Sequence, residues 1–344
     1  MSHSGTLRPQ NGLRAGRGHR DGMKLITFAE KAGKQRIGAV SATNDYVDLR
    51  AVDPGLPADM RALFEAGDSG LNAARAALAK AESLGTGARG PAGAQVFYKP
   101  GEAKLRAPIL PKKFFHTAGN FREHHAEAEK AGFSHPVLPW IVFFQNVDAI
   151  IGPDEPVIYP PHLTDEVDYE LELAVVMKKS GKHFTAAEAW DYIGGYLIFN
   201  DVTARDIQRR EMKSGVFSFC KGIDTFCPLG PWIVTADEIA NPNNLTMELR
   251  VNGEPRQRSH SSRMWVTIPE IVANYSPMGY SAGDVLSTGT VSGVAAFSGD
   301  PKAWYLKPGD MMECEIEKIG VLRNPVISWQ QAYGAEPPPK RKIE

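Results

Sequence analysis

The first apolar patterns along the chain begin at Met23. Apolar and polar residues alternate in short runs separated by polar turns, which is the pattern of β-strands. Apolar residues at helical spacing, such as Leu71, Ala74 and Leu78, follow these runs. The predicted strands are Lys24–Phe28, Arg36–Val40 and Tyr46–Leu49, and the predicted helices lie near Pro57–Glu65 and Leu71–Ser83. With a Gly/Ala-rich linker at 85–93, the pattern predicts a small α+β N-terminal domain over residues 23–105.

From Pro108 onward, short β-like runs dominate and few helices interrupt them. The predicted strands are Trp140–Gln145, Ala149–Ile151, Pro156–Tyr159, Tyr169–Met177, Tyr196–Phe199, Pro231–Val234, Thr246–Val251, Asp284–Ser287 and Met311–Ile316. A threonine with a glutamate three residues later predicts three helix starts, at Thr185, Thr235 and Thr267. Strands without regular strand–helix alternation predict a mostly β, mostly antiparallel α+β fold over residues 106–335. No GxGxxG motif follows a strand, which disfavours a nucleotide-binding sheet.

The two ends of the chain lack such patterns. Residues 1–22 contain four arginines with several Gly and Ser and have no apolar core, which argues against a secretory signal. We predict a disordered extension there, with an organelle transit peptide as the alternative. Residues 336–344 combine three prolines with three basic residues and are predicted to form an exposed tail.

Composition narrows the class of protein. The apolar set makes up 42% and charged residues 23% of the 344 residues, which suits a globular core. A formal net charge of −1 gives no general electrostatic reason to bind nucleic acid or an anionic membrane. The longest apolar stretch, Val137–Phe144, is far shorter than the roughly 20 residues of a membrane helix. Three cysteines without regular spacing favour a reducing compartment, hence the cytoplasm, and Cys220 and Cys227 are predicted to be buried thiols rather than zinc ligands.

Acidic residues are the sharpest feature of the sequence. In the segment DYELELAVV, Glu170 and Glu172 are two residues apart on a predicted strand, so they share a face with backbones roughly 6.5–7 Å apart. Asp201 ends the apolar strand Tyr196–Phe199. An edge strand with a solvated acidic face, and a helix cap at Asp201, are the alternatives. Three carboxylates without a soft ligand predict Mg²⁺ or Mn²⁺, with Ca²⁺ as the less favoured ion.

Other polar clusters suggest catalytic groups. His124 and Glu127 lie one helical turn apart, and a carboxylate beside an imidazole makes a general base. A solvated helix turn is the alternative, and His125 is a rival within the motif. Arg205, Gln208 and Arg209 share a helix face. Lys221 precedes a Gly/Pro-rich loop and could stabilise a developing enolate; a surface lysine is the alternative for it.

Together, the segments DYELEL, NDVTARDIQ, KGIDTFCPLGPW and VNGE resemble the fumarylacetoacetate hydrolase family over roughly residues 106–325. The resemblance implies a mixed β-sandwich roll of the family's C-terminal-domain type, Mg²⁺ or Mn²⁺, and a homodimer. It assigns the roles residue by residue: metal ligands Glu170, Glu172 and Asp201; catalytic residues His124, Glu127 and Lys221; and substrate-binding residues Arg205, Gln208 and Thr290. Phe121, Gln145, Val291 and the segment Lys130–Pro139 depart from the family pattern and border the substrate pocket.

The predicted activity is hydrolysis of a carbon–carbon bond in a β-dicarbonyl or acylpyruvate-like keto acid, in the catabolism of aromatic or related compounds. His124, oriented by Glu127, would activate water, and the metal would act as Lewis acid. A decarboxylase, lyase or isomerase of small keto acids on the same metal site, such as one acting on oxaloacetate, is the alternative. Dependence of activity on the His124/Glu127 pair would discriminate between them. A non-catalytic metal- or ligand-binding protein is the third reading.

Overall fold

The computed structural model describes residues 22–30, 33–130, 141–216 and 218–340. The predicted extension 1–22, apart from its last residue, therefore lies outside the described residues. The same holds for nearly all of the segment Lys130–Pro139 and for the last four residues of the predicted tail. None of the helices in the described ranges is long and apolar enough to cross a membrane.

One long sheet runs through both predicted domains. Its strands follow the order β4-β3-β2-β1-β14-β12-β11-β17-β6-β7, with β5 beside β1 and β8 beside β14. The N-terminal strands are β1 (Lys24–Ala29), β2 (Gln35–Val40), β3 (Tyr46–Asp48), β4 (Phe97–Tyr98) and β5 (Lys104–Arg106). The later strands are β6 (Phe114–Ala118), β7 (Ile141–Phe144), β8 (Ile150–Ile151), β11 (Leu171–Met177), β12 (Ile193–Asn200), β14 (Cys227–Thr235) and β17 (Val285–Thr290). The join is antiparallel, with Lys24 opposite Val234 and Leu25 opposite Ile233.

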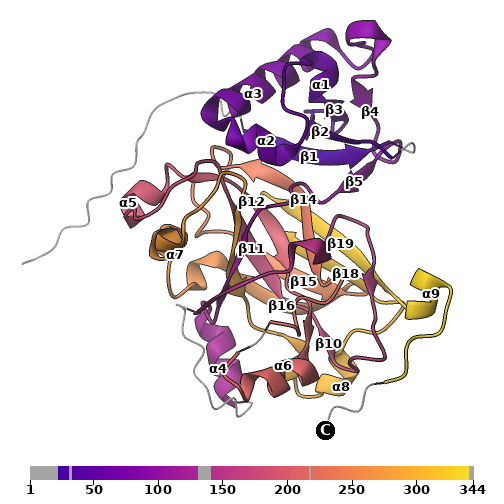
Figure 1. The fold of residues 1–344 in the computed structure, drawn as a ribbon, viewed down its shortest axis with the longest axis vertical. Helices are drawn as coiled ribbons and strands as arrows, with labels where there is room; N and C mark the ends of the chain where they lie inside the picture. Colours follow the sequence, from indigo (N-terminus) through magenta and orange to yellow (C-terminus); the bar gives the residue numbers. More distant parts are fainter. Residues whose placement is uncertain (1–21, 31–32, 131–140, 217, 341–344) are drawn as a thin grey trace, which may run out of the picture.

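A second sheet packs against the lower part of the long one (Figure 1). It contains β9 (Val157–Ile158), β15 (Thr246–Val251), β16 (Glu254–His260), β18 (Met311–Ile316) and β19 (Gly320–Ile327), and a separate pair is formed by β10 (Val167–Asp168) and β13 (Thr203–Ala204). Side chains of β11 alternate between two cores, because successive residues of a strand point to opposite faces. Leu173 and Val175 enter the core with the second sheet, and Ala174 and Val176 enter the core with the N-terminal helices. The centre of the long sheet is therefore buried on both faces.

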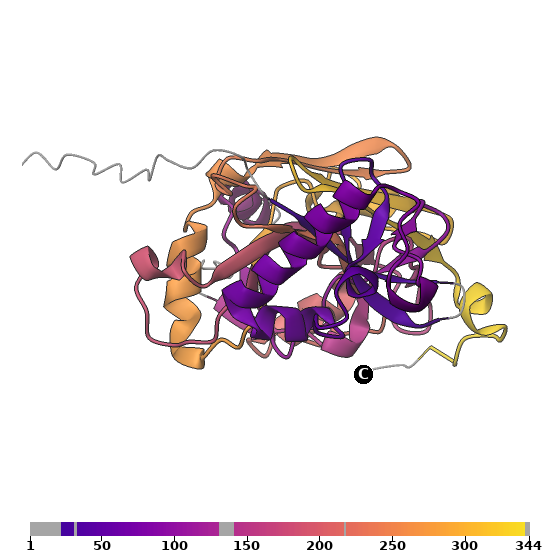
Figure 2. The same ribbon diagram turned by 90° about the horizontal axis from the view of Figure 1, so that it is seen from above.

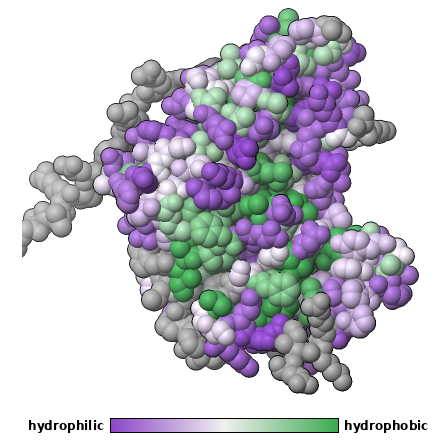
Figure 3. Space-filling view, in the orientation of Figure 1, coloured by the Kyte–Doolittle hydropathy of each residue, from purple (hydrophilic) through white to green (hydrophobic). Residues whose placement is uncertain are grey.

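Nine α-helices in the described ranges pack around the two sheets. They are α1 (Leu49–Val52), α2 (Met60–Glu65), α3 (Gly67–Leu84), α4 (Arg122–Lys130), α5 (Ala186–Ala189), α6 (Arg205–Met212), α7 (Ile268–Tyr275), α8 (Pro301–Trp304) and α9 (Trp329–Tyr333). Seen from above, α3 crosses diagonally over the strands of the N-terminal unit (Figure 2). On the face shown in Figure 3, apolar residues gather over the middle, below the N-terminal unit. The helices α4 and α6 lie at the opposite end from that unit (Figure 1).

The predicted fold class, a mostly β α+β fold, is confirmed. Helix starts at Thr185 and Thr267 are confirmed as capping boxes. The predicted start at Thr235 is wrong, because Thr235 is the last residue of β14 and its hydroxyl accepts a hydrogen bond from the Met23 amide at 2.9 Å. All three cysteines are buried free thiols, which confirms the prediction for Cys220 and Cys227. Seven strands were not predicted from the sequence: β6, β16, β19 and the short strands β4, β5, β10 and β13.

Candidate metal centre and active site

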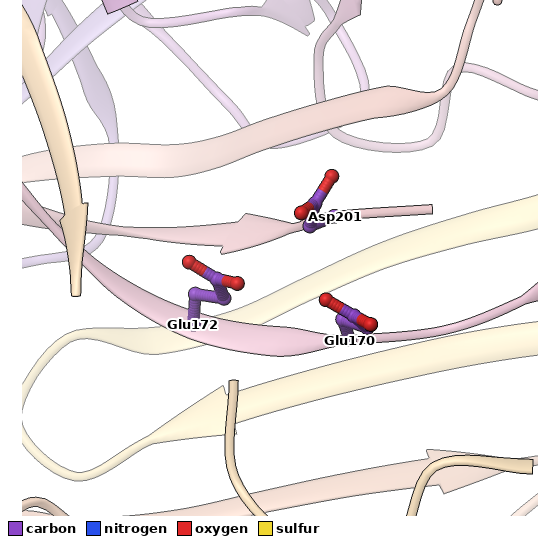
Figure 4. Close-up of side chains that lie close together, drawn as sticks. All are labelled: Glu170, Glu172 and Asp201. Atoms are coloured by element: carbon purple, nitrogen blue, oxygen red, sulfur yellow. The ribbon is translucent and has the colours of Figure 1, made fainter. Parts of the chain in front are cut away.

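Three buried carboxylates meet where two neighbouring strands end. Glu172 lies on β11, Glu170 precedes it by two residues, and Asp201 follows directly after β12. Glu172 pairs across the ladder with Phe199, so strand alternation places Asp201, two residues further on, on the same face. One oxygen from each acid lies within 4.8 Å of the others, and Figure 4 shows the three side chains gathered between the strands. The predicted i, i+2 pair and the strand-end acid are thus brought together.

Two buried cations hold these acids. The Lys221 ammonium donates to Asp201 Oδ2 at 2.6 Å, to Glu170 Oε2 at 3.1 Å and to the Thr203 hydroxyl at 2.8 Å. The Arg205 guanidinium lies 2.6 Å from Glu170 Oε1. Lys221 is 3% exposed, so the surface-lysine alternative does not describe it.

The electrostatics differ among the three acids. Burial raises the pKa of Glu170, but the charges of Lys221 and Arg205 outweigh burial and lower that pKa below its usual value. Burial also raises the pKa of Asp201, and Lys221 again reverses the sign. For Glu172, burial and the repulsion of Asp201 and Glu170 act together and raise the pKa well above its usual value. Without a further positive charge, Glu172 is the acid that takes up a proton.

The donor set fits a hard divalent cation. The buried cluster contains four carboxylates, those of the three acids and of Asp168, and two cations, Lys221 and Arg205. Four negative and two positive charges leave two negative charges, which one divalent ion neutralises. Asp201 Oδ1 is buried and has no hydrogen-bond partner among the described residues, so it is available as a ligand atom. Oxygen donors alone favour Mg²⁺ or Mn²⁺ over softer ions.

The two histidines of α4 line the same pocket as the three acids. His124 is 15% exposed; its Nδ1 lies 3.8 Å from Glu127 Oε2, and its ring lies 5.4 Å from the ring of Phe297. The Glu127 carboxylate accepts hydrogen bonds from the Gly293 amide at 3.1 and 3.0 Å. His125 faces Trp265 instead, with ring centroids 5.5 Å apart. Glu127 therefore ties α4 to the loop after β17 and keeps a carboxylate beside His124.

The predicted substrate-binding residues also surround this pocket. Gln208 Oε1 accepts a hydrogen bond from Arg205 Nη1 at 2.8 Å, and Thr290 lies opposite Glu172 in the β11–β17 ladder. The residue before Thr290, Gly289, donates its amide hydrogen to Glu172 Oε2 at 3.1 Å. Gly289 has φ +88°, and a Cβ there would approach the Thr117 carbonyl oxygen to 3.0 Å, so this position in β17 favours glycine.

Two buried residues that the sequence analysis did not assign belong to the centre. Asp168 accepts hydrogen bonds from Arg205 Nε at 2.7 Å and from the Ala295 and Ala296 amides at 2.8 and 3.0 Å. It thereby connects the metal centre to the loop that holds Glu127. His116, on β6, places Nδ1 3.3 Å from Asp201 Oδ2. Asp168 belongs to the acidic segment DYELELAVV, so the sequence could have suggested it. No strand was predicted at β6, so nothing in the sequence indicated that His116 would reach the centre.

The mostly β fold and the buried set of oxygen ligands define a candidate divalent-metal enzyme. The chain matches a family model described as "Fumarylacetoacetate (FAA) hydrolase C-terminal" over residues 113–327. It therefore belongs to the fumarylacetoacetate hydrolase family, which confirms the resemblance.

Relatives within the family have different activities. The chain is 36% identical over 310 residues to a Rattus norvegicus protein named oxaloacetate tautomerase Fahd2a, mitochondrial, covering 89% of this chain and 92% of the relative. A solved fumarylacetoacetate hydrolase from Exiguobacterium antarcticum is 30% identical with a TM-score of 0.71, covering 89% and 99% of the two chains. Maleylpyruvate hydrolase from Sphingobium sp. SYK-6, solved with manganese(II) and pyruvate, is 25% identical with a TM-score of 0.68, covering 89% and 99%. Hydrolase and isomerase chemistry are both represented.

Proposed function

We propose that this chain is a Mg²⁺- or Mn²⁺-dependent enzyme that catalyses keto–enol tautomerisation of a small 2-oxo acid of the oxaloacetate type. The observation that carries the proposal is the buried three-carboxylate centre, which shares one pocket with His124. The reaction type is supported by the relative named as an oxaloacetate tautomerase, which aligns with 89% of the chain. Tautomerisation corresponds to the isomerase alternative given by the sequence, whereas the first prediction from the sequence was hydrolysis.

The residues around the centre suit a substrate that becomes negatively charged at its carbonyl oxygen. A divalent ion held by Glu170, Glu172 and Asp201 would supply Lewis-acid polarisation of the 2-oxo acid. The positive charge of Lys221, held in place by three hydrogen bonds, would stabilise the oxygen on which negative charge develops. Arg205, Gln208 and Thr290 would orient the substrate carboxylate.

His124 is the proposed base. Its imidazole would take a proton from the carbon next to the carbonyl and return it to the carbonyl oxygen, so that the keto form becomes the enol with no bond broken between carbons. Glu127 would fix the tautomer of the imidazole, because its carboxylate is itself held by the Gly293 amide. The apolar neighbour Phe297 keeps the base against the pocket wall.

Hydrolysis of a carbon–carbon bond is the second candidate. The observation that favours it is the same His124–Glu127 pair, since an oriented imidazole can equally deprotonate a water molecule. The maleylpyruvate hydrolase and fumarylacetoacetate hydrolase likenesses also support it.

The two candidates are separated by what happens to the carbon skeleton. Purified protein with Mg²⁺ or Mn²⁺ should speed the decay of enol absorbance of oxaloacetate and the exchange of its C3 hydrogens with deuterium in D₂O. Acylpyruvates incubated in parallel should yield no cleaved acid. Release of pyruvate from an acylpyruvate, without accelerated tautomerisation, would replace the proposal with hydrolysis.

Two alanine variants test the base. His124→Ala should lose about 10²–10⁴-fold in tautomerisation rate, the range typical of general-base removal, with little change in metal affinity. His125→Ala is the matched control, because its ring lines the same pocket but faces Trp265. Equal losses in both variants, or a loss below about tenfold for His124→Ala, would remove His124 from this role.

A further inference from the structure

His116 sits in an aromatic cage at the edge of the metal centre. It is the third residue of β6 and is 1% exposed. Its ring lies 4.9 Å from Phe114, 4.5 Å from Phe143 and 4.9 Å from Phe199, measured between ring centroids. Three rings around one imidazole leave few directions in which its nitrogens can find a partner.

Neither nitrogen of His116 has a well-aligned hydrogen-bond partner among the described residues. The nearest charged atom is Asp201 Oδ2, 3.3 Å from Nδ1. The same Oδ2 accepts a hydrogen bond from Lys221 at 2.6 Å, while Oδ1 has no partner in the described part of the chain. The two oxygens of Asp201 therefore differ: nitrogen groups surround one, and the other is free.

We infer that His116 is a positioning residue for the metal ion. Its Nδ1–H, together with the Lys221 ammonium, holds Asp201 Oδ2 and so fixes the rotation of the carboxylate that presents Oδ1 to the ion. The inference rests on the divalent ion of the proposed function, and it adds a residue outside the three acidic ligands. Groups behind metal ligands commonly set their orientation and thereby the metal affinity.

Two observations favour this role over the alternatives. His116 is not part of the group of described residues whose ligand atoms converge within 4.8 Å, so the geometry does not make it a direct ligand. A purely structural role is disfavoured as well, because the only polar contact of this buried imidazole is to the Asp201 carboxylate, and an apolar residue would fill the cage at a lower cost. The loss of stability is explained if the imidazole orients the Asp201 carboxylate for metal binding.

Substitution at position 116 separates these roles. In His116→Leu the cage stays apolar and the donor is lost; in His116→Asn the side-chain amide takes the approximate place of Nδ1–H. Calorimetric titration with Mg²⁺ and, separately, Mn²⁺ should show about 10–100-fold weaker binding of both ions to His116→Leu, the range seen when groups behind metal ligands are removed. His116→Asn should recover most of that loss. The metal-free His116→Leu protein should melt no lower than the wild type.

Phe114→Leu is the control for the substitution of His116. Phe114→Leu perturbs the same cage without touching Asp201, and it should bind both ions like the wild type. Unchanged affinity in His116→Leu, or equal weakening in Phe114→Leu, would overturn the positioning role. Loss of Mn²⁺ binding with Mg²⁺ binding retained would make His116 a direct ligand instead, since nitrogen donors favour Mn²⁺ over Mg²⁺. If the wild type itself binds neither ion, the metal part of the proposed function fails, and this inference with it.

Discussion

Replacing Lys221 with methionine tests whether its ammonium stabilises the folded protein in addition to its proposed role of stabilising negative charge on the substrate. The substitution keeps most of the side-chain volume and removes the charge that Asp201 and Glu170 face at 2.6 and 3.1 Å. Removing one partner of a buried ion pair typically costs about 3–5 kcal/mol, because the other charge stays buried and unpaired. At about 2–4 °C per kcal/mol for chains of roughly this size, the melting temperature of the metal-free protein should fall by on the order of 10 °C.

A second lysine gives a matched control for this experiment. Lys178 Nζ lies 3.0 Å from Asp68 Oδ1, the same kind of contact, but Asp68 is 75% exposed. An exposed pair contributes about 0–1 kcal/mol, so Lys178→Met should melt close to the wild type. Urea unfolding in excess chelator measures both variants. Equal free energies of unfolding for Lys221→Met and Lys178→Met would falsify the claim that Lys221 stabilises the buried acids.

Four further outcomes are expected. Glu172→Gln should stabilise the metal-free protein at neutral and higher pH, because the pKa of Glu172 is raised in the folded protein. The destabilising effect of Glu172 appears as pH rises above its pKa in the unfolded chain, about 4.3, and should vanish below that pH. Unfolding curves measured over a range of pH in chelator would check the sign. Asp201→Ala should weaken Mg²⁺ binding and abolish turnover while the fold survives, which unchanged affinity in calorimetry would contradict. A chain starting at Met23 should keep the activity and melting temperature of the full chain, and a large drop in melting temperature would show that the extension packs on the fold. The predicted homodimer should give twice the chain mass in analytical ultracentrifugation, with a monomer mass as the refuting result.

The acidic ligands were predictable because they follow from local periodicity. A strand places residues i and i+2 on one face whatever it packs against, so Glu170 and Glu172 could be paired from the sequence. Asp201 could be added because it ends an apolar run. His124 and Glu127 follow from helical spacing in the same way. Each of these statements needs only neighbours in sequence.

The parts that could not be predicted depend on contacts between distant residues. The N-terminal strands join the long sheet through Leu25 and Ile233, a pairing that neither local pattern reveals. The strand β6 has the sequence FFHTA, in which a buried histidine interrupts the apolar run. Thr235 and Glu238 match a capping box, but the ladder with β1 and β12 keeps Thr235 in a strand. Tertiary pairing overrides the local propensity there.

The three proposed metal ligands differ in their electrostatic surroundings in the metal-free protein. Glu170 is held between Arg205 and Lys221, and Asp201 faces Lys221 and His116, so these contacts lower the pKa of both carboxyls and position them before an ion binds. Such preorganisation reduces the ordering cost of binding. Among the described residues, no cation lies within ion-pair distance of Glu172, whose Oε2 accepts one hydrogen bond, from the Gly289 amide. Glu172 is therefore the ligand that must lose a proton when the ion binds, so metal affinity should rise with pH until the carboxyl of the metal-free protein is fully ionised.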